Sequence, residues 1–354
     1  MRILVTGGAG FVGSNIALRL KKMYPKASIV AFDNLRRRGS ELSIPRLKKA
    51  GIEFFHGDIR IPNDLESTGK ADLIIEASAE PSVHAGYGQS PAYVLQTNLV
   101  GTINALEHAR IHGSQIIFLS SSRIYPIDPI RSLPLTPTST RLEIEEGAKG
   151  HGWSKEGITE DFGLEGHRSM YGATKLASEL LIEEYKQMYK LNAVVYRCGC
   201  LAGPWQMGKV DQGFVVLWAS RHLYGGSLAY MGFGGTGLQV RDLLHIDDLG
   251  DLVLLQVGKQ LPRTVYNVGG GYTGSVSLQE ATRLCEERAG RSIGIGSVPE
   301  TRSADIPWYI TDCSRIQTEM GWKPTRSKED LFDDVFFWLK EHQDSLYGIL
   351  GPEA

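Results

Sequence analysis

The sequence predicts an α/β protein with a doubly wound parallel sheet, and two features carry that prediction. Short apolar runs alternate with longer helix-like stretches through the first two hundred residues, as is typical of parallel strands joined by helical crossovers. The first apolar run also ends in a glycine-rich turn that leads directly into a helix-like segment. The expected strands are 2–6, 28–33, 52–57, 72–77, 115–120 and 192–197, and the expected helices are 11–22, 90–112 and 168–189.

The glycine-rich turn lies within Leu-Val-Thr-Gly-Gly-Ala-Gly-Phe-Val-Gly, residues 4–13. Glycines there permit a tight turn and let the backbone approach a pyrophosphate, which then faces a helix N-terminus. Asp33 ends the second apolar run twenty positions beyond Gly13, where a carboxylate can accept hydrogen bonds from ribose hydroxyls. Strand, turn, helix and acid together predict a dinucleotide-binding Rossmann domain.

The arginine run that follows Asp33 bears on which dinucleotide binds. Arg36, Arg37 and Arg38 could pair with a 2′-phosphate, which would favour NADP. Asp33 would itself repel that phosphate, however, and three arginines in a polar turn are more often a solvated patch. We therefore expect NAD, with Arg36 near its adenosine end.

Composition narrows the class of protein further. The 354 residues carry 38 basic and 40 acidic side chains, a net charge of −2, which implies no general affinity for nucleic acid or anionic membrane. Met1-Arg2 leads straight into the first strand and no apolar run reaches membrane-spanning length, so we expect a cytoplasmic protein without a signal peptide. The 4 cysteines are too scattered for a disulfide framework, and we expect no metal site.

The chain after residue 125 is organised differently from the alternating part. Residues 126–167 are rich in Pro, Thr, Ser, Gly and charge, and so long an irregular insertion is usually functional or disordered. Two interpretations are open. The insertion is a lid or substrate-facing loop that carries His151 and Trp153, or it is a solvated surface loop. We expect an NAD-binding domain at 1–197 that includes this insertion and a smaller α/β substrate domain at 198–354. Sheet-like pieces at 228–232, 239–243 and 264–268 suggest that the part around 239–268 packs back on the first domain.

Tyr171-Gly-Ala-Thr-Lys175 is the second informative constellation. Positions i and i+4 share one helix face, and a neighbouring ammonium should lower the pKa of the tyrosine toward working pH, making it a usable acid/base. Ser120, Ser121 and Ser122 follow the fifth expected strand, whose carboxyl end should open onto the cofactor crevice. A serine hydroxyl there could bond the same substrate oxygen as the tyrosine. Alone, such a tyrosine–lysine pair is more often an ordinary surface pair, but the nucleotide fold and the serines favour the catalytic reading.

With these residues in place, the chain resembles the extended short-chain dehydrogenase/reductase family over nearly its whole length. The resemblance rests on Thr6-Gly-Gly-Ala-Gly-Phe-Val-Gly13, Phe32-Asp-Asn-Leu35, His56-Gly-Asp-Ile-Arg60, Asn98-Leu-Val-Gly-Thr102, Tyr171-x-x-x-Lys175, Tyr196-Arg197, Gln239-Val-Arg-Asp-Leu-Leu-His-Ile-Asp-Asp248 and Tyr266-Asn-Val-Gly-Gly270. Within the family the chain looks most like the nucleotide-sugar 2-epimerases that act on CDP-paratose. Asp211-Gln-Gly213 is the more subgroup-like feature.

The resemblance implies a role for each matching position. Tyr171 would be the acid/base, Lys175 its electrostatic partner and a ligand of the nicotinamide ribose, and Ser121 the orienting hydroxyl. The cofactor would be held by Gly7, Gly10, Phe11, Val12, Asp33, Asn34, Arg36, Asp58, Ile59, Ala77, Ala79, Asn98 and Ser120. The sugar nucleotide would meet Ser121, Gln212, Gln239, Arg241 and Arg302. The two arginines suit a diphosphate because guanidinium is a permanent, bidentate donor, although a surface salt bridge is the ordinary alternative for either.

One stretch departs from the family pattern. Glu76-Ala-Ser-Ala-Glu-Pro81 stands where relatives commonly carry His-x-Ala-Gly or His-x-Ala-Ala. Ala77 and Ala79 are the residues of this stretch that we expect to line the cofactor.

The reaction that the resemblance implies is epimerisation by transient oxidation. Tyr171 would take a proton from a sugar hydroxyl while the carbon gives hydride to nicotinamide, and the hydride would return to the other face of the keto-sugar. The subgroup implies C2 of a CDP-linked sugar. A 4-epimerase of a UDP- or CDP-hexose and a net sugar-nucleotide oxidoreductase stay as alternatives. A 4,6-dehydratase would need an acid pair where Ser122 and Arg123 stand, and a dinucleotide-sensing module would have no use for Tyr171 and Lys175.

Oligomerisation and pathway enter only through the resemblance. It implies pairing of subunits through the helix that carries Tyr171, as a homodimer or homotetramer, and a place in polysaccharide biosynthesis. Neither the oligomer size nor the preferred nucleotide can be derived from the residues.

Overall fold

The computed structural model describes residues 1–210 and 212–352, which form two compact units. Unit 1 comprises residues 1–124, 169–198 and 246–266, and unit 2 comprises 125–168, 199–245 and 267–354. The insertion that we placed with the first domain thus belongs to unit 2, and part of the segment expected to pack back belongs to unit 1. Among the described residues, no helix has the length and apolar character needed to cross a membrane.

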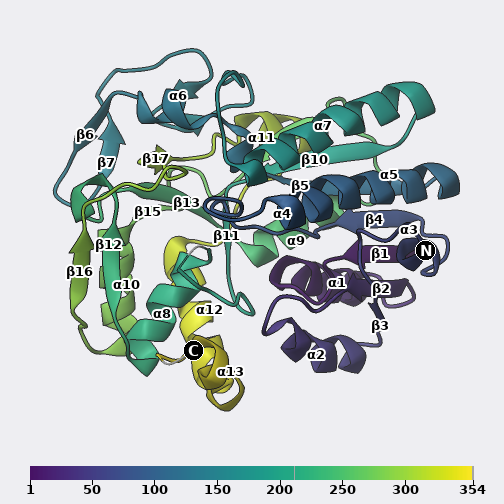
Figure 1. Ribbon diagram of the computed structural model, residues 1–354, viewed down its shortest axis with the longest axis horizontal. Coiled ribbons are helices and arrows are strands. Elements are labelled where there is room, and N and C mark those ends of the chain that lie inside the picture. The colour runs from purple at the N-terminus through teal and green to yellow at the C-terminus, as the bar shows by residue number, and fades with distance from the viewer. Residues whose placement is uncertain (211, 353–354) are drawn as a thin grey trace. The chain divides into compact units, whose positions relative to one another are not determined.

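Unit 1 is built on a seven-stranded sheet in the order β14-β10-β5-β4-β1-β2-β3 (Figure 1). Its strands are β1 (Arg2–Thr6), β2 (Ser28–Asp33), β3 (Glu53–His56), β4 (Leu73–Glu76), β5 (Gln115–Ser121), β10 (Ala193–Cys198) and β14 (Val265–Val268). The strands from β3 to β10 all pair in parallel. The order runs outward from β1 in both directions, so the predicted doubly wound sheet is confirmed.

Helices cover both faces of this sheet (Figure 1). They are α1 (Phe11–Met23), α2 (Ile44–Lys49), α3 (Pro62–Glu66), α4 (Ala92–Leu95), α5 (Gly101–His112), α7 (Met170–Tyr189) and α9 (Ile246–Gln256), with short turns η1 (Ser40–Ser43), η2 (Gln96–Val100) and η3 (Ser122–Ile124). Helix α1 packs against α9, and α5 packs against α7. Right-handed crossovers that leave β1 in opposite directions place their helices on opposite faces.

Strand alternation explains the core on the α5 and α7 side. Because successive side chains point to opposite faces, one face of the sheet gathers Leu4, Val30, Phe32, Ile74, Ile116, Phe118 and Val195, which pack with Ala105, Leu106 and Ile182 of the helices. Glu76 and Ser120 lie two positions beyond Ile74 and Phe118. They therefore face the same helix layer, although they are polar.

The expected elements of unit 1 match the observed ones to within about two residues, with one exception. The helix expected at 90–112 is interrupted at Gln96–Val100 by a π-helical turn. Turns of this type insert one residue into the helical ladder and are frequent at functional sites. Nothing in the apolar periodicity of the segment marks it. Helices α2 and α3 were not expected because each is only about one turn long.

Unit 2 consists of small sheets and helices. A four-stranded sheet joins β11 (Cys200–Ala202), β13 (Val240–His245), β15 (Ser275–Ser277) and β17 (Trp308–Tyr309), and β12 (Leu228–Met231) pairs with β16 (Ile295–Val298). The helices are α6 (Ile127–Arg131), α8 (Phe214–Tyr224), α10 (Leu278–Ala289), α11 (Ser314–Met320), α12 (Lys328–Glu341) and α13 (Gln343–Leu350), with a short turn η4 (Phe233–Gly235). Capping boxes at Ser277 and Ser327 fix the starts of α10 and α12.

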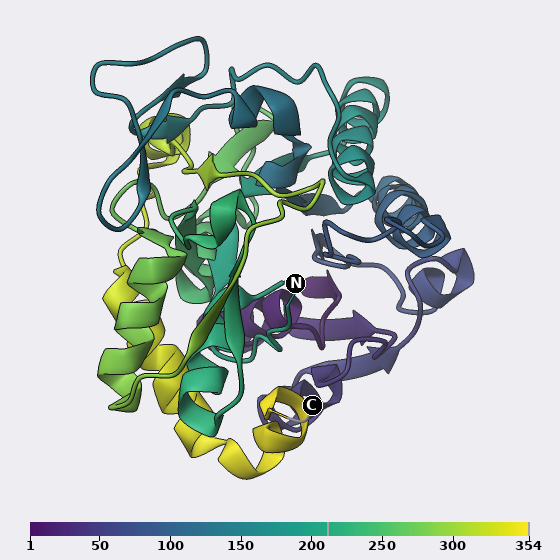
Figure 2. The ribbon, with the colours of Figure 1, turned by 60° about the vertical axis from the view of Figure 1, so that its left-hand side comes forward.

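The insertion is more ordered than its composition suggests. It contains α6 and two hairpins, β6 (Leu135–Pro137) with β7 (Leu142–Ile144) and β8 (Trp153–Ser154) with β9 (Gly157–Ile158). The β6–β7 hairpin is the loop that reaches outward from α6 in Figures 1 and 2. Its anchor is an arginine rather than an apolar cluster, which is why hydrophobic periodicity does not reveal it.

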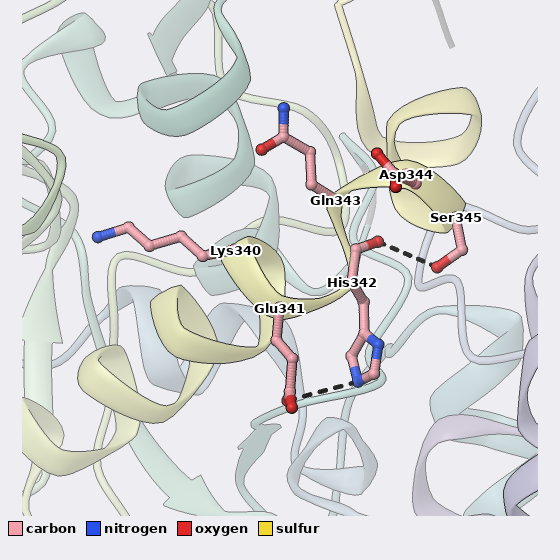
Figure 3. Close-up of a pocket in the computed structure, with 6 residues that line it drawn as sticks. All are labelled: Lys340, Glu341, His342, Gln343, Asp344 and Ser345. Atoms are coloured by element: carbon pink, nitrogen blue, oxygen red, sulfur yellow. Dashed lines mark hydrogen bonds and ion pairs between the residues drawn. The ribbon is translucent and has the colours of Figure 1, made fainter.

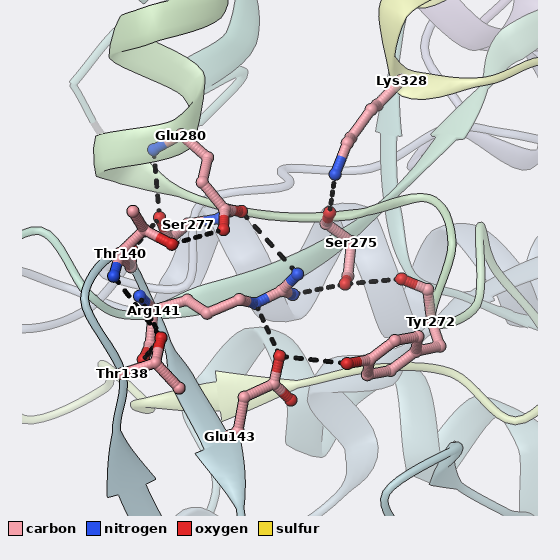
Figure 4. Close-up of polar contacts among 9 residues, drawn as sticks. All are labelled: Thr138, Thr140, Arg141, Glu143, Tyr272, Ser275, Ser277, Glu280 and Lys328. Atoms are coloured by element: carbon pink, nitrogen blue, oxygen red, sulfur yellow. Dashed lines mark hydrogen bonds and ion pairs between the residues drawn. The ribbon is translucent and has the colours of Figure 1, made fainter.

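That anchor is Arg141, which ties the hairpin to the start of α10 and to β15 (Figure 4). Its guanidinium lies 3.0 Å from the Glu143 carboxylate and 3.7 Å from that of Glu280, and it donates a hydrogen bond to the Ser275 hydroxyl. The Arg141 side chain is only 13% exposed. Ion pairs that are mostly removed from water and share several partners stabilise more than exposed pairs do.

We expect R141A to detach the β6–β7 hairpin and to lower the free energy of unfolding by about 2 kcal/mol, because two carboxylates lose their charged partner. Hydrogen exchange of residues 135–144 and chemical denaturation would measure both effects. R141K is the matched control: it keeps the charge but loses the planar fork, so its effect should be intermediate. Unchanged exchange in R141A would contradict the anchoring role.

Candidate active site

The turn between β1 and α1 has a backbone that only glycine fits. Gly7 has φ +63°, and a Cβ there would lie 2.7 Å from the Ala77 carbonyl oxygen. A Cβ on Gly13 would lie 2.2 Å from the Gly7 carbonyl oxygen. Gly10 is the N-cap of α1 and makes no side-chain capping bond, and the first turn of α1 carries no acid. The N–H groups of that turn are therefore suited to an anion such as a pyrophosphate, so the predicted cofactor fits this cradle.

Asp33 closes the cradle from the end of β2. Its carboxylate accepts hydrogen bonds from Ala9 N (3.1 Å) and Leu35 N (2.8 Å). Burial raises the pKa of Asp33, and these backbone N–H groups oppose the rise. An ionised carboxylate has about four acceptor positions, so its oxygens can also accept ribose hydroxyls.

The side chains expected around the adenosine form a connected group. Asn34 Nδ2 donates to Asp58 (3.1 Å), and Arg60 donates to both Asp58 oxygens, holding the pKa of that carboxyl well below its usual range. The Arg36 guanidinium lies 3.8 Å from the centre of the Tyr93 ring. Arg60 and Tyr93 were not expected in this group. Arg60 is identified by its contact with Asp58, and Tyr93 by its contact with Arg36.

Three other expected cofactor residues lie where protein contacts already engage them. The Ala77 carbonyl packs on Gly7, and Ala79 is half-buried next to Glu80. Asn98 lies in the π-helical turn η2, where its amide accepts from Glu80 N (2.8 Å) and donates to Glu80 O (3.1 Å) and Thr174 (3.3 Å). Asn98 thus fastens the segment after β4 to α7. A direct contact between Asn98 and the cofactor stays a prediction.

Other expected residues also have packing contacts. Phe11 and Val12 form the half-buried start of α1, and Ile59 is buried. A Cβ on Gly101 would lie 2.7 Å from Ile59, which explains the glycine at the start of α5.

Tyr171 and Ser121 lie together at the end of β5 and the start of α7. Ser169 caps α7 by accepting a hydrogen bond from Gly172 N (3.3 Å), which fixes the first turn and hence Tyr171. The Ser121 hydroxyl bonds the Tyr171 hydroxyl and lowers the tyrosine pKa, but burial is the larger effect and raises it. The expectation that this pKa is lowered is therefore wrong for the structure as it stands.

Lys175 does not offset this effect of burial, because its ammonium is directed into the sheet. It donates to the Leu119 carbonyl (2.9 Å), lies 4.4 Å from the centre of the Phe118 ring, and is 3.8 Å from a Glu76 carboxylate oxygen. Lys175 is 2% exposed and Glu76 is fully buried. The sequence correctly predicted that the tyrosine and the lysine lie on one helix face. It did not indicate that a carboxylate forms an ion pair with the lysine.

Ser120 points to the other face of β5 from Ser121. Its hydroxyl donates to Glu179, which also pairs with Arg197 through bonds of 2.8 and 3.0 Å. Glu179 and Arg197 were not expected as part of this neighbourhood. Their signal in the sequence is the spacing of Tyr171, Lys175 and Glu179 at i, i+4 and i+8 on one helix face.

In unit 2, three arginines meet the turn at residues 302–306. Arg241 donates to the Ile306 carbonyl (2.6 Å), and Arg302 pairs with Asp305 (2.9 Å). Arg131, from α6 in the insertion, donates to the carbonyls of Arg302 (2.9 Å) and Asp305 (2.9 Å). The structure therefore brings the two expected diphosphate ligands to one turn and adds a third arginine that sequence reasoning missed.

The two expected glutamines carry buried polar atoms that lack a partner among the described residues. These atoms are Gln239 Oε1 and Gln212 Nε2. The other end of the Gln239 amide donates to Met231 O (3.0 Å). A buried polar atom without a hydrogen bond is costly, so both positions suit a polar ligand. Asp211 of the subgroup-like segment lies outside the described residues.

Two hollows among the described residues are lined by residues other than these. One, of about 340 Å³, is lined by the six consecutive residues 340–345 between α12 and α13 (Figure 3). Its hydrogen bond from Ser345 Oγ to His342 O (3.0 Å) belongs to the turn itself. A second hollow, of about 470 Å³, lies within the insertion and is lined by residues 129–165, including His151 and Trp153. Both are open surface features.

One cluster of possible metal ligands occurs among the described residues, although none was expected. Glu66, His108 and His112 offer ligand atoms within 4.8 Å of one another. His112 and Glu66 form an ion pair of 3.3 Å, and the rings of His108 and His112 lie 4.5 Å apart. The cluster joins α3 to the end of α5.

Comparison with known proteins follows from this geometry. The model of the "NAD dependent epimerase/dehydratase family" matches residues 3–269. The chain belongs to that family. CDP-paratose 2-epimerase of Salmonella typhi is 29% identical, the alignment covering 96% of this chain and 99% of that protein. The UDP-glucose 4-epimerase of Thermus thermophilus in complex with NAD is 25% identical, with a TM-score of 0.75 and 96% and 99% coverage.

A dehydratase is equally similar in structure. A double mutant of DesIV, a dTDP-glucose 4,6-dehydratase from Streptomyces venezuelae with NAD bound, is 26% identical, with a TM-score of 0.78 and 98% coverage of both chains. Membership confirms the predicted fold, NAD as cofactor, and an enzyme of the nucleotide-sugar epimerase type. The family includes epimerases and dehydratases, so it does not by itself name the reaction.

We expect G13A to abolish retention of NAD, because the new Cβ would meet the Gly7 carbonyl backbone at 2.2 Å and force the cradle open. Nucleotide released by denaturing the purified protein would be measured by absorbance and chromatography. G348A is the control, since a Cβ there meets nothing within 4 Å. Wild-type NAD content in G13A would refute the assignment of this turn to the pyrophosphate.

Proposed function

We propose that the protein is a 2-epimerase of a CDP-linked sugar such as CDP-paratose, acting by transient oxidation and return of hydride to the opposite face. The observation that carries the proposal is that Ser121 acts on Tyr171 at the head of α7, with Lys175 one turn further on. The resemblance to CDP-paratose 2-epimerase, which extends over 96% of the chain, supports the choice of substrate.

In this mechanism the side chains of the protein bind and orient the sugar nucleotide and transfer one proton. Bound NAD would supply the acceptor and donor of hydride. Tyr171 takes the proton from the sugar hydroxyl as the C–H bond breaks, and gives it back when the ketone is reduced. Ser121 orients that oxygen through its hydroxyl, and Lys175 provides positive charge behind the phenol. Because the hydride returns to the same sugar, no external reductant is consumed.

Unit 2 itself holds groups suited to a diphosphate. Arg302 lies on the turn at residues 302–306 and Arg241 on β13 donates to that turn, and a guanidinium group is a bidentate donor. Arg131 clamps the backbone of that turn through two carbonyls, so it supports the position of the other two. The unpartnered amide atoms of Gln239 and Gln212 are suited to hydroxyl or nucleobase groups of the sugar nucleotide.

Two alternatives use the same groups. A 4-epimerase differs only in which carbon lies nearest the nicotinamide, a matter of about one ångström in substrate position. A net oxidoreductase would need cofactor that exchanges with solution. A 4,6-dehydratase is less favoured because Ser122 and Arg123 stand where that reaction needs its acids.

The purified protein, with no cofactor added, should interconvert CDP-paratose and CDP-tyvelose, and the coupling of the sugar C2 proton in NMR spectra would follow the change. Y171F should lose at least about 10²-fold in kcat, because the proton acceptor is removed. Y189F, on the exposed end of the same helix, is the matched control.

Each outcome decides between the candidates. Inversion at C2 without added NAD supports the proposed reaction and retained cofactor together. No change at C2, with nicotinamide bound, would overturn CDP-paratose as substrate and favour a 4-epimerase. Turnover that requires stoichiometric NAD would favour a net oxidoreductase.

We also propose that two copies pair through α5 and α7. These helices lie side by side (Figures 1 and 2), and their outer surface leaves Ile111, Leu180 and Met188 59–65% exposed. Large apolar side chains gathered on one exposed surface mark an association site. Light scattering should give at least a dimer for the wild type, and L180D/M188D should be shifted toward monomer by two desolvated charges. A monomeric wild type would refute the pairing.

A further inference from the structure

Glu76 is the feature that neither the sequence motifs nor the proposed mechanism explains. It ends β4 and is fully buried. Burial raises the pKa of Glu76, while the Lys175 ammonium at 3.8 Å and the Ser78 backbone N–H lower it. Burying a carboxylate costs several kcal/mol unless a charge or hydrogen bonds compensate. A buried carboxylate next to Lys175 lowers the stability of the fold, so its presence suggests a functional role.

The sheet register places Glu76 beside the lysine. Glu76 pairs with Phe118 across the β4–β5 ladder, and the Lys175 ammonium lies over the Phe118 ring while donating to the next carbonyl, Leu119 O. Glu76 faces the α7 layer because strand alternation puts it on the same face as Ile74. The lysine is thus held between a carbonyl, an aromatic face and a carboxylate.

We propose that Glu76 is a positioning residue of the catalytic pair, which fixes the Lys175 ammonium against β5 and makes the Tyr171–Lys175 pair hold its proton more strongly. The inference rests on the proposed function of Tyr171 as the acid/base. A negative charge nearby opposes loss of a proton from either group, because it disfavours the tyrosinate and favours the ammonium. The sign is therefore the same whichever group loses its proton first.

Other titratable groups also act on the pair. Glu179 lies one turn beyond Lys175 on α7, but Arg197 on β10 neutralises it through an ion pair of 2.8 Å. Arg123 in η3 lowers the pKa of Tyr171, and Cys198 on β10 and Glu76 raise it. For Lys175, burial lowers the pKa, and Glu76 is the largest of the groups that raise it. Glu76 is thus the carboxylate that forms an ion pair with the Lys175 ammonium, at 3.8 Å.

The test is the pH dependence of kcat/KM for wild type, E76Q and E76D. E76Q keeps the shape and removes the charge, so the acidic limb of the profile should move to lower pH by about one unit. E76D keeps the charge and should retain the wild-type limb. E53Q removes an exposed carboxylate from β3 of the same sheet and should leave the profile unchanged. A merely structural role for Glu76 would lower activity at every pH without moving the limb.

A second readout does not depend on the substrate. Tyrosinate absorbance would be titrated in each protein and in the same protein carrying Y171F, so that the difference reports Tyr171 alone. The midpoint should be lower in E76Q than in wild type and E76D. If CDP-paratose is not turned over, this difference still tests Glu76, so failure of the proposed function and failure of this inference are distinguishable.

Folding is checked by circular dichroism and thermal melting. If E76Q does not fold, E76H replaces the carboxylate by a polar ring that is neutral above the histidine pKa, and it should shift the midpoint in the same direction there. Equal midpoints in wild type and in a folded E76Q or E76H would overturn the proposal, because they would mean that Glu76 carries no charge in the working protein.

Discussion

The burial of four charged side chains between α7 and the parallel sheet is the constraint on which unit 1 depends. Lys175 and Glu179 are on α7, Glu76 ends β4, and Arg197 is on β10, and each is at most 6% exposed. A parallel sheet is normally covered on both faces by apolar side chains, so these groups are tolerated only because they compensate one another. Glu179 and Arg197 form a bidentate ion pair. Lys175 donates a hydrogen bond to a backbone carbonyl and forms an ion pair with Glu76. Their formal charges sum to zero when all are ionised.

The same constraint fixes the position of the reacting hydroxyls. Ser120 bonds Glu179 on one face of β5, so strand alternation directs Ser121 to the opposite side, where it meets Tyr171. Ser169 holds the first turn of α7 in register with that strand end. One buried charged layer therefore determines where both the phenol and its orienting serine lie.

Much of unit 1 is predictable because its signals are local. A glycine turn, an acid at the end of β2 and a tyrosine–lysine spacing each report on contacts within one βαβ unit or one helix turn. Glu76 and Tyr93 were missed because their partners, Lys175 and Arg36, are distant in sequence and only the fold brings them together. The same holds in unit 2, where Arg131 and Arg141 belong to a segment that composition describes as irregular. Their guanidinium groups organise that segment through carbonyls and carboxylates, and such contacts leave no periodic pattern.

The charge balance of the buried layer also bears on the pKa of Tyr171, which burial raises. A tyrosinate would add one uncompensated negative charge to a site whose other charges cancel and from which water is largely excluded. In such a site Coulomb interactions are stronger than in water, so the cost of that extra charge exceeds what one hydrogen bond from Ser121 returns. The raised pKa of Tyr171 follows from this arrangement. The helix spacing places Lys175 near Tyr171. The contacts of the ammonium with Leu119 O and Glu76 in the sheet then limit how far its charge lowers the tyrosine pKa.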